Sequence, residues 1–361
     1  MFRACLLPMA WASAFVAVSP LAAAPTAAHE AGASSPAADH GLPLAHPQTE
    51  RFVDGQLKAW YAPAAQRFAT SADALAERTQ AWCSSPAGKA AGPELVAARG
   101  AWVQAMLSWT RLSTVPIGPL LDRHSETRLD FQPMRPQALD KVIASPTAPG
   151  EWAMDRVGAQ ARGLPAMEYM LWKKPALPRS PACAYLAVLA RDLRDEARGL
   201  ATAYAAEAAA TRSPEQAAAW LNTYVNQWMS GVSRLRWKDI EMPVRSWGMD
   251  QAPRATSGQT AAAWKERWQA LRVPTVGGPG TPEGLLPLAA YLRARGLDAP
   301  AQALGRAADA ADAAMKDAGP TTPGPKLLDA ATQIDRVTHV VKRDVTQLMQ
   351  IQLEFSADDG D

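Results

Sequence analysis

The sequence has 361 residues, of which 48% are hydrophobic and 20% are charged, so it can bury a substantial core and is not a disordered chain. Its 37 Lys and Arg residues nearly balance its 35 Asp and Glu residues, and the charges are spread along the chain. Without a basic stripe, the sequence excludes nucleic acid and an anionic membrane surface as expected partners.

Residues 1–28 have the pattern of a secretory signal peptide. Arg3 supplies the positive start, residues 4–18 form an apolar run, and residues 21–28 offer small side chains for cleavage. Cys5 comes before the apolar run, which is too early for a lipidated cysteine. No later segment reaches the roughly 18 uninterrupted apolar residues of a membrane span. We therefore expect an exported protein that is soluble once the signal is removed.

Residues 29–49 are rich in Ala, Ser, Pro and Gly, and this composition predicts a mobile tail. The tail contains His29, His40 and His46. Scattered histidines in such a segment are usually only solvated, so they receive no role.

Beyond the tail, apolar residues recur at helical spacing and no segment shows the alternation of a strand. The predicted fold class is therefore all-α, built from helical bundles. Helices are expected over residues 51–83, 95–109, 183–204, 214–235, 260–271 and 326–349. Ser213 and Gln216 form a capping box before the fourth of these.

The connections between these helices suggest how the chain is organised. The break at residues 173–181 is taken as a boundary between an N-terminal bundle, 50–176, and a C-terminal bundle, 177–361. Residues 237–255 look irregular. Residues 273–280 form a Gly/Pro loop that lacks the preceding strand and the following Lys-Ser/Thr of a phosphate-binding loop, so we interpret it as a linker.

Two cysteines remain after the signal peptide, Cys83 and Cys183. An exported compartment allows them to pair, and we predict that they do. Such a bond would close a loop of roughly 100 residues, for which the chain-entropy model gives about 4 to 5 kcal/mol of stabilisation. The alternative is two buried free thiols.

The stretch 158–172, GAQARGLPAMEYMLW, places one carboxylate, Glu168, among apolar residues. Gly163 breaks the preceding pattern, and Pro165 suits the first position of a new helix. A buried carboxylate needs a partner or a metal ion. Glu168 is therefore a helix cap, a member of an ion pair with an arginine, or a ligand.

The polar segment 122–136 contains the densest mixture of candidate ligands outside that stretch, namely His124, Glu126, Arg128 and Asp130. Loops of this kind often carry function. The competing interpretation is a surface connection with ordinary ion pairs.

Sequence motifs of the common enzyme classes are missing: there is no His-Glu-x-x-His helix, Cys-x-x-Cys pair, Gly-x-Ser-x-Gly elbow or dinucleotide fingerprint. We assign no catalytic residue. His339 lies between Val337 and Val341 on the last predicted helix, where a lone histidine is more often a packed or edge residue than a ligand. The tryptophans lie mostly at helical spacing and are expected in the core.

A family resemblance emerges from two motifs together. The stretch 163–172 resembles the imelysin signature, Gly-x-His-x-x-Glu followed by an aromatic residue, and residues 355–361 resemble its closing Asp-Gly-Asp. Supporting features lie between and before them: Trp109 with Arg111, the Gly118-Pro119 pair, residues 128–133, and a cysteine pair similar to that of the branch described as predicted periplasmic lipoproteins. The resemblance spans residues 50–361.

This resemblance implies an all-α fold of two bundles with the site where they meet, a periplasmic location and a link to iron acquisition. The family is also classed as a metallopeptidase. Only Gly163 and Glu168 of the first motif carry over, because Pro165 occupies the histidine position and has no donor atom for a metal.

The leading hypothesis is a periplasmic protein that assists iron uptake without catalysis, by binding iron, an iron-bearing ligand or a partner protein. The expected ligand-binding residues are Gly163, Glu168, Arg128 and Asp130, and the expected donors for iron or another divalent or trivalent metal are Glu168, Glu126 and His124. One alternative is a metal-dependent peptidase. Another is a structural or interaction scaffold in which Glu168 belongs to a buried ion pair.

Overall fold

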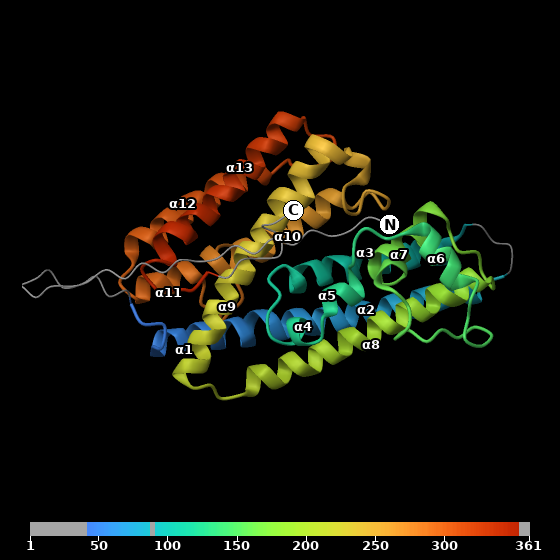
Figure 1. Cartoon of the computed structure of the whole chain (residues 1–361), viewed down its shortest axis with the longest axis horizontal. Coiled ribbons are helices and arrows are strands. Elements are labelled where there is room, and N and C mark those ends of the chain that lie inside the picture. The colour runs from blue at the N-terminus through green and yellow to red at the C-terminus, as the bar shows by residue number, and fades with distance from the viewer. Residues whose placement is uncertain (1–41, 87–90, 354–361) are drawn as a thin grey trace, which may run out of the picture. The chain divides into compact units, whose positions relative to one another are not determined.

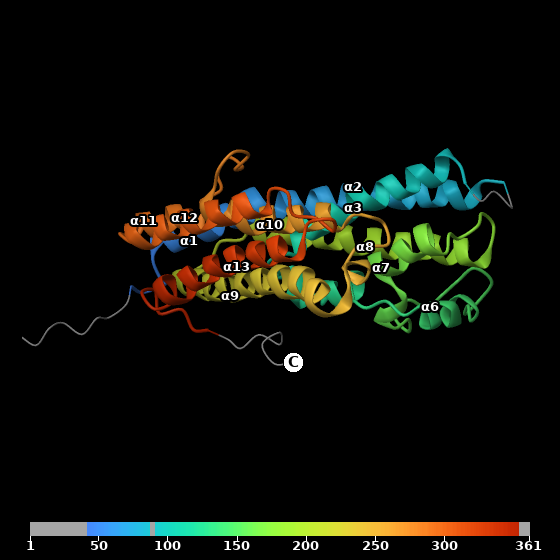
Figure 2. The same cartoon turned by 90° about the horizontal axis from the view of Figure 1, so that it is seen from above.

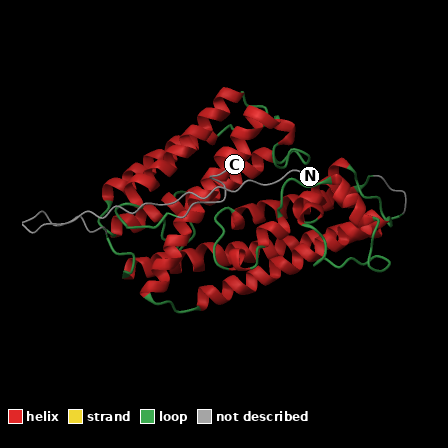
Figure 3. Ribbon diagram, viewed as in Figure 1, coloured by secondary structure: helices red, strands yellow, loops and turns green. Residues whose placement is uncertain are grey.

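The computed structural model describes residues 42–86 and 91–353, and within them every regular element is helical (Figures 1 and 3). A single isolated β-bridge joins Ala148 and Glu151 in the described ranges. The all-α prediction is therefore confirmed. The expected signal peptide and the C-terminal Asp-Gly-Asp lie outside the described residues.

The first helical run continues for almost forty residues without a break in the chain path. It consists of α1 (Pro47–Gly55), a π-helical segment (Gln56–Tyr61) and α2 (Ala62–Ser84). Pro63 lies just after the π-helical segment, inside this continuous run, and as a proline it donates no backbone N–H there. Residues 47–49, which the sequence assigns to a tail, form the first turn of α1, and His46 Nδ1 accepts a hydrogen bond there from the Gln48 N–H.

The remaining helices follow in chain order. They are α3 (Pro93–Ser113), α4 (Pro119–Asp122), α5 (Ser125–Leu129), α6 (Pro136–Ile143), α7 (Gly163–Glu168), α8 (Pro181–Ala209), α9 (Pro214–Ser233), α10 (Thr260–Val276), α11 (Leu288–Ala294), α12 (Asp298–Met315) and α13 (Gly324–Val340). Short 3-10 turns lie at Ala159–Ala161 and Met249–Gln251, and further π-helical segments lie at Tyr169–Lys173, Arg234–Glu241, Pro243–Trp247 and Val341–Val345.

Several local predictions can be compared with these boundaries. The capping box is confirmed, because Ser213 Oγ accepts from the Gln216 N–H and Gln216 Oε1 accepts from the Ser213 N–H. The expectation that residues 237–255 are irregular is wrong in its first half, since π-helical turns prolong α9 as far as Trp247. The segment 122–136 likewise contains α5. In both segments the backbone forms helical hydrogen bonds although the apolar side chains no longer recur at helical spacing.

The long helices pack in two groups. Helix α2 packs along α3 and α8, and α12 packs along α13; α10 contacts α3 and joins the groups (Figures 1 and 2). One continuous apolar core runs beneath them, and it includes most of the tryptophans. The described residues belong to one compact unit. Division of the chain into bundles at residues 176 and 177 stays a prediction, and any such division has to account for the packing of α8 on α2.

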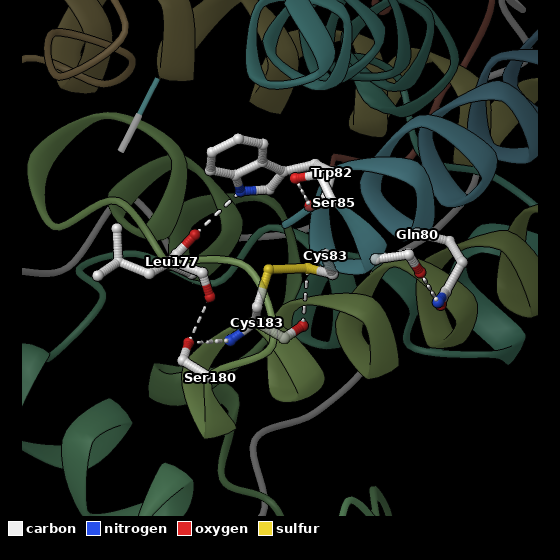
Figure 4. The surroundings of a disulfide bond; sticks show 9 residues. Gln80, Trp82, Cys83, Ser85, Leu177, Ser180 and Cys183 are labelled. Carbon is white, nitrogen blue, oxygen red and sulfur yellow. Dashed lines mark hydrogen bonds between the residues drawn. A yellow bond between two sulfur atoms is a disulfide. The ribbon is translucent and has the colours of Figure 1, made fainter. Parts of the chain in front are cut away.

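The disulfide links the end of α2 to the start of α8 (Figure 4). Cys83 and Cys183 are bonded with their Cα atoms 5.4 Å apart, as predicted. Neighbouring hydrogen bonds hold the same junction: Trp82 Nε1 donates to the Ala176 carbonyl, and Ser180, the N-cap of α8, accepts from the Cys183 N–H. The bond therefore fastens one end of the most extensive helix pair in the described chain.

Candidate functional site: a buried arginine between two carboxylates

Gly163 determines where the motif helix lies. Its φ angle is +72°, a conformation that favours glycine, and a Cβ atom at this position would be 2.3 Å from the Leu129 carbonyl oxygen. The start of α7 therefore touches the end of α5 backbone to backbone. The glycine of the motif brings Glu168, at the end of α7, into the same region as Asp130, which follows α5.

Glu168 is buried, with 6% of its surface exposed. Its Oε1 accepts hydrogen bonds from the Ser257 N–H at 2.9 Å and the Ser257 hydroxyl at 2.7 Å. Its Oε2 lies 3.8 Å from Nη1 of Arg254. The carboxylate lies at the last residue of α7 and binds groups far away in the chain, so it is not an N-terminal cap. Of the three alternatives open from the sequence, the ion pair with an arginine is the one that the geometry shows.

Asp130 binds the other side of the same arginine. Its Oδ1 accepts from Arg254 Nη2 at 2.5 Å, and its Oδ2 accepts from the indole N–H of Trp109 at 3.1 Å. Gln132 Nε2 lies 3.4 Å from Oδ1. Two of the predicted ligand-binding residues, Asp130 and Glu168, are thus brought together, but by a third residue that the sequence analysis did not select.

Arg254 is central to this arrangement. It has a left-handed backbone, with φ of +66°, and lies 5.6 Å above the ring of Trp102. Burial lowers the pKa of its guanidinium, but the charges of Asp130 and Glu168 and the hydrogen bond to Asp130 outweigh that effect and raise the pKa above its usual value. We call Arg254, Glu168, Asp130, Ser257 and Trp109 the Arg254 cluster.

Sequence reasoning missed Arg254 and Ser257 because they lie in a segment without helical periodicity, 86 or more residues after Glu168 along the chain. The available signal was indirect. A carboxylate expected in apolar surroundings, such as Glu168, requires a partner, and arginine is the side chain that most often supplies the positive charge in a protein interior.

The other residues predicted on segment 122–136 face elsewhere. Arg128 donates to Glu196 at 2.8 Å and to Asp192 at 2.6 Å, both on α8. Glu126 pairs with Arg234, and His124 is an exposed residue with φ of +50° just before α5. The structure therefore separates Arg128, Glu126 and His124 from the Arg254 cluster.

Arg128 belongs to a second charged group beside α8. Glu196, whose side chain is 1% exposed, accepts two hydrogen bonds from Arg123, one from Ser125 and one from Arg128. We call the full set the Glu196 cluster: Glu196, Asp192, Arg123, Ser125, Arg128 and Arg162. Burial raises the pKa of the Glu196 carboxyl, but the hydrogen bonds and charges of this set outweigh burial and bring the pKa below its usual value.

A metal ion does not fit the Arg254 cluster as it is arranged. The guanidinium lies between the carboxylates of Glu168 and Asp130, where a shared metal ion would have to lie, and Pro165 offers no donor atom. In residues 42–86 and 91–353 no group of three or more His, Cys, Asp or Glu side chains is placed to hold a metal. In the same ranges no helix is long and apolar enough to cross a bilayer.

Comparison with known proteins agrees with this motif. The imelysin family model, described as peptidase M75, matches residues 61–350. The fold is similar to that of an imelysin-like protein from Psychrobacter arcticum 273-4, with a TM-score of 0.70 and 20% identity over 85% of this chain and 98% of that one. A structure assigned as a putative iron-regulated protein A precursor, from Parabacteroides distasonis ATCC 8503, has a TM-score of 0.62 and 15% identity over 81% of this chain and 95% of that one. No curated protein matches. From the motif, the fold and the family model, the chain belongs to the imelysin family.

Proposed function

We propose that this imelysin-family protein assists iron uptake in the periplasm by binding an iron-bearing ligand or a partner protein, without catalysing a reaction. A periplasmic location is supported by the signal-like residues 1–28. A connection with iron is supported by the name of the similar fold from Parabacteroides distasonis, an iron-regulated protein A precursor.

The observation that favours binding over catalysis is the position of Arg254. Its guanidinium forms ion pairs with Asp130 and with Oε2 of Glu168. The Ser257 hydroxyl donates a hydrogen bond to the other oxygen of Glu168, Oε1. The Glu168 carboxylate is therefore hydrogen-bonded at Oε1 and charge-paired at Oε2 inside the protein, which favours a structural or binding role over direct attack on a substrate. General-base or metal-ligand chemistry at Glu168 would first require Arg254 to leave, which would expose a buried charge pair.

Cells that lack the protein provide the test. Uptake of radioactive iron under iron limitation should fall in the deletion strain and be restored by the wild-type gene. The purified mature protein should leave unfolded protein substrates intact, with and without a chelator. Unchanged iron uptake in the deletion strain would contradict the iron role, and chelator-sensitive cleavage by the pure protein would establish the metal-dependent peptidase instead.

A second function, a structural or interaction scaffold, is favoured by the ion pair between Glu168 and Arg254. In that case the Arg254 cluster only stabilises the fold. Glu168→Ala should then lower the melting temperature and leave iron uptake unchanged at temperatures where the variant is folded. Loss of uptake by a folded Glu168→Ala protein would exclude the purely structural role.

A further inference from the structure

A separate cavity of about 500 Å³ opens between α10 and α12. Its walls come from a stripe on α10, from the end of α12 and from the loop after α10. The lining residues are Lys265, Trp268, Gln269, Arg272, Pro279, Asp312, Ala313, Met315 and Lys316. We call this cavity the basic pocket. Its volume falls within the range of small-molecule sites.

The charges of the basic pocket are unbalanced. Three cationic side chains, Lys265, Arg272 and Lys316, line it together with a single carboxylate, Asp312. That carboxylate is already engaged, because Oδ1 accepts from the indole N–H of Trp268 at 2.6 Å and Oδ2 accepts from Arg272 Nε at 2.8 Å. The two lysines, Lys265 on α10 and Lys316 directly after α12, have no side-chain partner among the described residues, so their ammonium groups remain available to a ligand.

Arg272 is held in place before any ligand arrives. Besides Asp312 it binds the Gly277 carbonyl, and its Nη2 lies 3.9 Å from the exposed carboxylate of Asp309. Gly278 leaves room for the guanidinium, since a Cβ atom there would be 2.3 Å from Arg272 Nη1 and the arginine would have to shift. The Gly/Pro loop that the sequence suggests is a linker therefore packs around a fixed guanidinium, and Pro279 from the same loop forms part of the wall.

The remaining walls suit a ligand of limited size. Trp268 and Met315 are buried apolar side chains in the wall of the cavity, and the Gln269 amide adds a neutral hydrogen-bonding group. Oxygen anions form their strongest hydrogen bonds with ammonium and guanidinium donors. We propose that the basic pocket binds a small oxygen-rich polyanion, of the tricarboxylate or condensed-phosphate type.

Calorimetric titration of the full mature protein, with its disulfide intact, tests this proposal. Citrate and pyrophosphate are added separately at low ionic strength, with sodium chloride as the blank. At least one of them should bind with a stoichiometry of one, and added salt should weaken the binding. Citrate alone would identify a carboxylate site, pyrophosphate alone a phosphate site, and both together a general polyanion site. Absence of binding by either at millimolar concentration would overturn the proposal.

Variants locate the binding. Lys265→Gln combined with Lys316→Gln should weaken it about tenfold or more, because two charge-assisted hydrogen bonds are lost. Lys326→Gln, an exposed lysine at the start of α13 outside the pocket, is the matched control and should bind as the wild type does. Both lysines of the pocket are exposed, so the melting temperature should not change. Equal affinity of the double variant and the wild type, or equal weakening by the control, would refute the site.

The polyanion site does not rest on the proposed iron role. A further titration, with ferric citrate in place of citrate, does depend on the proposed iron role. It measures whether the bound anion can carry iron. Loss of binding on adding iron would count against a role in iron uptake and leave the anion site established.

Discussion

The Arg254 cluster and the Glu196 cluster both include residues of the segment 122–136. They differ in how much of their arginine side chains is exposed to water. Arg254 has 3% of its side chain exposed, whereas Arg123 and Arg128, the arginines that bind Glu196, have 39% and 36% exposed. A buried ion pair that loses one partner leaves a charge without solvation, while a half-exposed arginine can turn to water. The two clusters should therefore differ in how much stability is lost when one charged member is removed.

The largest loss of stability is expected when the Arg254 cluster loses its arginine. Arg254→Met should lower the free energy of unfolding by about 3–5 kcal/mol, because Glu168 and Asp130 would stay buried without a counter-charge. Urea denaturation followed by circular dichroism measures the change. Arg343→Met, which removes an arginine paired with Asp344 at the surface, is the control and should change stability by less than about 1 kcal/mol. A stable Arg254→Met protein would show that the cluster is open to solvent.

A smaller loss is expected from Gly163→Ala. A left-handed backbone costs a non-glycine residue about 1–2 kcal/mol, and the backbone shift that relieves the clash with the Leu129 carbonyl adds to that cost, so about 2–4 kcal/mol is expected in total. The same denaturation measurement applies. Gly150→Ala is the control, because Gly150 also has a positive φ but a Cβ atom there would meet nothing within 4 Å. Equal losses in the two variants would mean that backbone conformation alone, and not the contact with Leu129, fixes Gly163.

The Glu196 cluster should be more tolerant of substitution, because two of its arginines are partly exposed to water. Glu196→Gln keeps the shape of the side chain but removes its charge, and we expect a loss of about 1–3 kcal/mol at neutral pH. Arg123 and Arg128 stay hydrated in the variant, which limits the cost. A loss as large as that of Arg254→Met would remove the distinction between the two clusters.

The smallest signal is a dependence on pH. Because the folded-state pKa of Glu196 lies below its unfolded value, its contribution to stability is present above the usual glutamate pKa and is lost as the pH falls through the folded-state pKa. The stability difference between wild type and Glu196→Gln should therefore shrink below about pH 4. A difference that stays constant as the pH falls well below that value would contradict the lowered pKa.

Much of the fold was predictable from local pattern, because apolar stripes, the capping box at Ser213 and the pairing of Cys83 with Cys183 depend on features visible in the sequence. The candidate site was predictable only in part. Glu168 and Asp130 stood out as carboxylates in apolar or mixed surroundings, but nothing local to Arg254 marks it among the many arginines. Its role is created by tertiary packing, which brings a loop without periodicity against α7 and α5.

Arg254 occupies the place between Glu168 and Asp130 that a metal ion would need. Calorimetric titration of ferrous iron, under anaerobic conditions, into the mature protein and into Glu168→Gln tests this claim most directly. We predict the same isotherm for both proteins, because Arg254 and Ser257 already contact the two oxygens of the Glu168 carboxylate. A stoichiometric iron site in the wild type that disappears in Glu168→Gln would contradict the account.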